Sequence, residues 1–138
     1  MYAIQSGTKK GAIVVPASDA LTDKEGYLVK LTNDGGTAKA ALPTAATDVC
    51  SYLVLEGAAA GSDVTLLPIT PGENIRVVAE STSIVPGDRI VGYAASAAGK
   101  ATEYASGDAF IVGVAEEVGD TEDQQVLIRP VLSFLNND

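Results

Sequence analysis

Short runs of apolar and β-branched residues, each bounded by Gly, Pro, Asn, Asp or Ser, recur along the whole chain. Runs of this kind are typical of β-strands joined by tight turns. They predict strands over residues 12–15, 26–31, 37–40, 51–56, 64–69, 74–79, 84–91, 99–104, 110–116 and 124–130. The hydrophobic pattern therefore predicts an all-β fold.

The residues between these runs predict specific turns. Asn33-Asp34-Gly35-Gly36 consists of residue types that accept the positive φ of a tight hairpin. Pro86-Gly87 places a fixed φ before a permissive residue, as turns require. Gly113 lies inside an apolar run and predicts a β-bulge or the close approach of another backbone.

The second half of the chain echoes the first at an offset of about 60 residues. Leu28-Val29 aligns with Ile90-Val91, and the run from Val64 to Pro68 aligns with the run from Val126 to Pro130. Such a spacing is long enough for one supersecondary unit. A duplicated β unit is one interpretation; the other is that any β protein repeats strands and turns.

We predict a compact β-barrel or sandwich-like domain over residues 16–138, with repeat halves 16–79 and 80–138. Residues 1–15 are expected to form an extended N-terminal arm and the first strand. The apolar tail from Val131 to Leu135 is either a last strand of the domain or an adhesive segment for a partner.

Composition limits both the core and the chemistry. The chain of 138 residues fits one domain or two small sub-domains, and it has no Trp and two Phe, so its core is largely aliphatic. The net charge of −9 disfavours direct binding to nucleic acid, and no segment is long and apolar enough for a membrane span or a secretory signal. Without His, the commonest acid–base group and zinc ligand is missing, so we expect no enzyme activity and no cofactor.

The remaining candidate residues give little support for catalysis, for a carrier lysine or for metal binding. Cys50 is the single cysteine and is expected to be a buried apolar residue. Thr22-Asp23-Lys24 shares its Asp-Lys pair with lipoyl carriers, although a solvated turn is the simpler interpretation. The carboxylates from Asp120 to Asp123 could form a weak cation site, and those of Glu116-Glu117 are not expected to converge on one substrate.

The second half resembles the small capsid decoration, or cement, proteins of tailed bacteriophages. Those chains show Pro-Gly-Asp, an apolar strand, a Gly-led hairpin, an apolar strand reading Gly-Val-Ala and a closing Val-rich strand. The matching residues here are Pro86 to Val91, Gly99 to Thr102, Ala109 to Ala115 and Gln125 to Ile128. The first half has Lys24-Glu25-Gly26 where Pro-Gly-Asp would stand.

The resemblance implies a structural virion protein that binds the outer surface of the phage head and cements neighbouring major capsid subunits. It implies as partners the major capsid protein and sister copies around a symmetry axis, with a trimer favoured over a dimer. The terminal segments would then make the contacts. The partner-contact residues so implied are Tyr2, Ile4, Lys9, Lys10, Ile13, Leu132, Phe134 and Leu135. The alternatives are a lipoyl- or biotinyl-carrier-like accessory module and a β-rich tail, baseplate or surface-layer protein.

Overall fold

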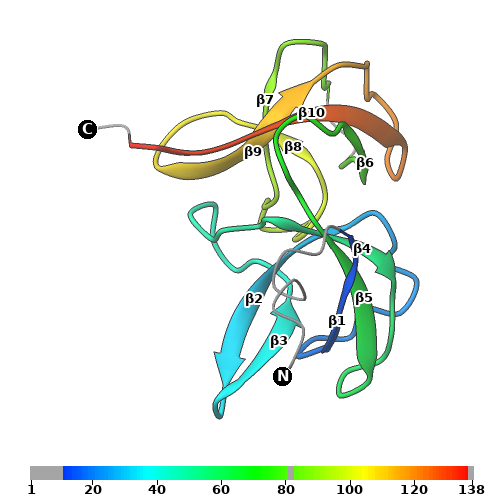
Figure 1. The fold of residues 1–138 in the computed structure, drawn as a ribbon. Helices are drawn as coiled ribbons and strands as arrows, with labels where there is room; N and C mark the ends of the chain where they lie inside the picture. Colours follow the sequence, from blue (N-terminus) through cyan, green and yellow to red (C-terminus); the bar gives the residue numbers. More distant parts are fainter. Residues whose placement is uncertain (1–10, 81–82, 137–138) are drawn as a thin grey trace.

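A computed structural model describes residues 11–80 and 83–136 of the chain, and strands and turns make up this part without a helix (Figure 1). The all-β prediction is thus confirmed. The strands are β1 (Ile13–Pro16), β2 (Leu28–Asp34), β3 (Thr37–Ala41), β4 (Tyr52–Glu56), β5 (Asp63–Pro68), β6 (Ile75–Val78), β7 (Arg89–Val91), β8 (Thr102–Glu103), β9 (Ala109–Ala115) and β10 (Gln125–Leu135).

These strands form two five-stranded antiparallel sheets with the same topology. The first has the order β1-β5-β4-β2-β3 and the second the order β6-β10-β9-β7-β8. Each sheet curls until its edge strands meet at one parallel bridge, Ala17 with Ala40 in the first and Ala79 with Ala101 in the second. We call them the first and the second barrel; in Figure 1 the second lies above the first.

The strand register shows that the two barrels repeat one unit. In the first barrel Val15 lies opposite Val64, and in the second Val77 lies opposite Val126. Both residues of the second pair follow those of the first by 62 positions. A shared strand order alone is common among small β folds, but the identical register of β1 with β5 and of β6 with β10 supports a duplicated unit.

The turn before β2 is also repeated, although its sequence is not. The Gly26 N–H donates to the Val54 carbonyl at 2.8 Å, and the Gly87 N–H donates to the Ala115 carbonyl at 2.9 Å. Both glycines have positive φ, which side-chain-bearing residues rarely adopt. Glycine is therefore the residue that the two turns share, whereas Pro86 has Glu25 as its counterpart.

The division between the sheets differs from the predicted repeat halves. Residues 69–74 join the barrels, so β6 belongs to the second sheet and β1 to the first. The predicted halves 16–79 and 80–138 instead put β6 with the first half and left β1 in the arm. Strand pairing decides membership of a sheet, and it is not visible in the local pattern. The sheets do not by themselves define domains, so the predicted domain boundaries, 1–15 and 16–138 with the halves 16–79 and 80–138, remain predictions.

The two barrels share a hydrophobic core. The first barrel buries a core of its own, but its Leu28, Cys50 and Leu53, with Ile69 of the linker, join the core cluster of the second barrel. The Leu28 N–H also donates to the Gly99 carbonyl across the junction at 2.7 Å. At Gly92 an added Cβ would lie 3.2 Å from the Cβ of Cys50, so the small residue permits this close packing.

Gly113 is a second place where the absence of a side chain matters. A Cβ built there would lie 2.4 Å from the carbonyl oxygen of Arg129 in β10. Any larger residue would push β9 and β10 apart. The predicted close approach of another backbone at Gly113 is confirmed.

We predict that Leu28→Ala lowers the free energy of unfolding by about 2–5 kcal/mol, because it opens a cavity in the core shared by both barrels. Leu55→Ala is the matched control: it truncates an exposed leucine of β4 and should cost less than about 1 kcal/mol. Urea unfolding followed by circular dichroism measures both. Equal stability of the two variants would contradict the shared core.

Cys50 is buried at this junction, with 2% of its surface exposed. Burial, assisted by the nearby charge of Asp48, raises the pKa of the thiol to about 12. A protonated, covered thiol is a poor nucleophile.

We therefore predict that a chromogenic disulfide reagent at about pH 8 modifies Cys50 more than about a hundredfold faster in the unfolded chain than in the folded one. The absorbance of the released thiolate gives both rates. Similar rates would show that the junction opens readily or that the thiol is exposed.

Candidate functional site

The predicted partner-contact residues fall into two groups. Tyr2, Ile4, Lys9 and Lys10 lie outside the described residues. Ile13 lies in β1 opposite Leu66 and is half-buried against the core of the first barrel. Part of its side chain therefore stabilises the fold itself.

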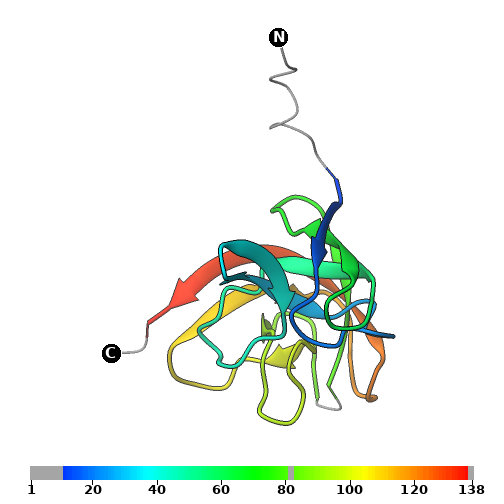
Figure 2. The same ribbon diagram turned by 90° about the horizontal axis from the view of Figure 1, so that it is seen from below.

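The other predicted contacts lie on an extension of β10. β10 runs on to Leu135, whereas its counterpart β5 ends at Pro68, the position that corresponds to Pro130. A bulge interrupts the pairing between Pro130 and Ser133, and residues 133–135 then pair again with β9. Figure 2 shows this end of β10 running outward from the barrels. We call residues Val131–Leu135 the β10 extension.

The side chains of the extension are buried to different degrees. Leu132 packs partly against the core of the second barrel, and Leu135 packs partly against Ala109 and Ile111. Phe134 is 64% exposed and meets the ring of Phe110 edge-on, with ring centroids 5.3 Å apart. Of the predicted contacts that the structure describes, Phe134 is therefore the most accessible, and their role in binding stays a prediction.

Val131 begins the apolar tail for which the sequence predicts a last strand or an adhesive segment; it is not among the individual contact residues named above, and it is 41% exposed. It occupies the position in the second barrel that Ile69 occupies in the first, where Ile69 is buried against the next barrel. The internal offset could have identified this pair, because it aligns Val131 with Ile69 of the linker.

The free edge of the sheet coincides with the extension. β6 pairs with β10 from Gln125 to Ile128, and no strand in the described part of the chain pairs with that edge beyond Ile128. Alternate backbone N–H and C=O groups of an edge strand point away from its one neighbour. The extension thus combines exposed apolar side chains with unpaired backbone groups.

The acidic loop before β10 is held by Lys100. Its Nζ lies 2.7 Å from Asp123 Oδ1 and 3.6 Å from Glu122 Oε1, and it also lies over the ring of Tyr27. The hydrogen bond to Asp123 raises the pKa of Lys100 above its ordinary value. The Lys100 ammonium group thus already engages two of the carboxylates considered for a weak metal-cation site, Glu122 and Asp123.

Glu116 and Glu117 bind different arginines. Glu116 accepts a hydrogen bond from Arg129, and Glu117 forms a two-bond pair with Arg76. They thus do not converge on one point, as the sequence predicted. Within residues 11–80 and 83–136, no three Cys, Asp or Glu side chains are grouped so that they could hold a metal ion. In the same ranges, no helix is long and apolar enough to cross a membrane.

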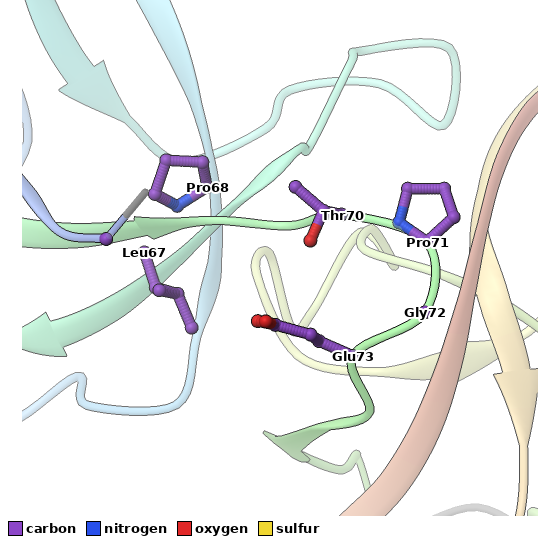
Figure 3. Close-up of a pocket in the computed structure, with 7 residues that line it drawn as sticks. Leu67, Pro68, Thr70, Pro71, Gly72 and Glu73 are labelled. Carbon is purple, nitrogen blue, oxygen red and sulfur yellow. The ribbon is translucent and has the colours of Figure 1, made fainter. Parts of the chain in front are cut away.

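A hollow of about 600 Å³ lies beside the linker between the barrels (Figure 3). Gly11, Leu67 and Pro71 form part of its wall, and the side chain of Glu73 points across it toward Leu67. Glu73 is the one ionisable group among its described lining residues. A single carboxylate against backbone and apolar groups offers a binding surface and lacks an acid–base pair.

No family model matches the sequence, and no curated protein is significantly similar to it. The fold is similar to a solved structure described as the head fiber gp8.5 N base in bacteriophage phi29. The TM-score is 0.69 at 17% sequence identity, and the match covers 91% of this chain and 98% of that chain. At this identity the likeness establishes a shared fold over nearly the whole of both chains.

Proposed function

We propose that this chain is a structural protein of a tailed-bacteriophage head. The observation that carries the proposal is the fold match with the phi29 head fiber base, which spans nearly all of both chains. The resemblance of the second half to cement proteins also supports a role in the phage head. It rests on separate features, the turns and strands around Pro86-Gly87 and Gly113.

The distribution of functional groups supports a binding role without catalysis. The lone thiol is buried and protonated, and the carboxylates near β10 pair with Lys100, Arg76 and Arg129. The exposed features are instead an apolar strand edge and a net charge of −9. Such a surface suits contact with other proteins and disfavours nucleic acid.

In the finer proposal, the chain binds the outer surface of the head and cements neighbouring major capsid subunits. A protein that binds only the expanded lattice stabilises that lattice by mass action. Sister copies around one symmetry axis would bind several subunits at once, so that weak single contacts sum to a strong attachment.

The carrier alternative requires an accessible lysine at a hairpin tip. Lys100 is largely buried, and the Lys24 Nζ lies 4.9 Å from the ring centroid of Tyr27. Both side chains thus already contact groups of this chain. A lipoyl or biotinyl mass increase on the intact protein would still favour a carrier.

We predict saturable binding of the purified chain to expanded heads of the phage that encodes it, with a fixed ratio to the major capsid protein. Co-sedimentation with heads stripped of this chain measures the ratio, and unexpanded heads are the control that should bind far less. A folded chain that stays in the supernatant at all concentrations would contradict the proposal.

We further predict that deleting residues 1–10 weakens head binding at least about tenfold and leaves the barrels folded, because both barrels are complete from Gly11 onward. The double substitution of Lys9 and Lys10 by Ala tests the charge of the segment. Lys39→Ala, at a half-buried lysine of β3 paired with Asp34, is the control and should bind normally. Parallel loss of circular-dichroism signal and binding would show that the segment belongs to the fold.

A further inference from the structure

The hollow beside the linker lies where the chain enters each barrel. Gly11 precedes the start of β1 by two positions, and Glu73 precedes the start of β6 by two positions, so the two residues occupy equivalent places in the internal repeat. Both line the hollow, together with the end of β5 and the linker (Figure 3). Its volume of about 600 Å³ falls in the range of ligand-binding pockets.

The wall of the hollow is apolar around one carboxylate. Leu67, Pro68 and Pro71 contribute apolar surface, and the side chain of Glu73 points across the opening toward Leu67 (Figure 3). Among the described residues, none forms an ion pair with the Glu73 carboxylate. The hollow therefore suits a peptide segment that combines apolar side chains with a positive charge.

The first ten residues of this chain have that composition. They include the apolar side chains of Tyr2 and Ile4, and they end in Lys9 and Lys10. None of them is acidic, so all 18 acidic residues lie in the remainder of the chain. The charge of this segment is therefore opposite to that of the body of the protein, and the two attract each other.

The same segment is attached at the rim of the hollow. Gly11, which directly follows Lys10, is itself one of the wall residues. Its φ of 122° is rarely adopted by residues with a side chain, so glycine permits the bend of the backbone at this point. A short tether gives a segment an effective concentration on the order of millimolar, so that weak contacts suffice to keep it bound.

We propose that residues 1–10 bind in the hollow of their own chain, with the ammonium group of Lys9 or Lys10 against the Glu73 carboxylate and the apolar side chains against the wall around Leu67. The hollow holds the segment on the free protein, and a binding partner that takes over these contacts releases it. This inference goes beyond the proposed function, because it concerns the chain before it meets any other protein.

Trypsin cleavage after Lys9 and Lys10 measures release of the segment, because cleavage tracks the fraction of the chain that is open. Rates are taken relative to a free peptide of residues 1–16. We expect Glu73→Gln to speed cleavage about two- to fivefold, the effect of an exposed ion pair on an equilibrium. Salt at about 0.5 M should speed cleavage of the wild type and change Glu73→Gln little, because it screens the same pair. Glu103→Gln, at an exposed glutamate of β8, is the matched control and should keep the wild-type rate.

A second measurement observes the hollow directly and leaves the barrels unchanged. Tyr2→Ala removes an aromatic ring far in sequence from the hollow, so nuclear magnetic resonance should show shifted amide signals of Thr70, Gly72 and Glu73 and an unchanged signal of Glu103. Unshifted signals in the hollow, or equal cleavage of the wild type and Glu73→Gln, would overturn the inference. Protection that grows with protein concentration would assign the hollow to the segment of a second copy and would overturn it too. No heads are used, so failure here is distinguishable from failure to bind a head.

Discussion

The arrangement of this molecule depends on the burial of first-barrel side chains in the core of the second barrel. Leu28, Leu53 and Ile69 contribute apolar surface, and glycine at position 92 allows the two sheets to approach. Two barrels of about 60 residues each would bury little surface alone. Their shared core makes one rigid body from two marginal units, and such a body can carry binding surfaces in fixed relative positions.

The same constraint bears on our proposal that the C-terminal part of β10 contacts other proteins. β5, the last strand of the first barrel, leads into the junction between the barrels, where the following Ile69 is buried. At the end of the exit strand of the second barrel, the apolar side chains of Val131 and Phe134 are exposed. In the described part of the chain, the duplicated pattern thus places Ile69 in the buried junction and its counterpart Val131 at an exposed strand edge. The Cys50 thiol is buried and protonated, and Asp123 is paired with Lys100, so neither is a free reactive group.

Much of this fold could be predicted from local sequence. Each run of apolar residues bounded by turn residues became a strand, because period and turn chemistry act over a few residues. Gly113 could be identified because a glycine weakens the interior of an apolar strand unless a bulge or a close backbone requires it. The strand order could not be predicted, since it depends on contacts between residues far apart in the chain. For the same reason the repeat boundary near residue 79 missed that β6 pairs with β10. Leu132 and Leu135 were expected to contact partners. Part of each side chain packs within the chain, Leu132 on the core of the second barrel and Leu135 on residues of β9. This packing depends on the bulge in β10, which the sequence does not show.

The central claim is that the two barrels form a binding body on the outside of a phage head. Electron cryomicroscopy of heads incubated with the chain tests it most directly. We predict density for both barrels on the outer capsid surface. Heads without added outer density, or density confined to the tail, would contradict it.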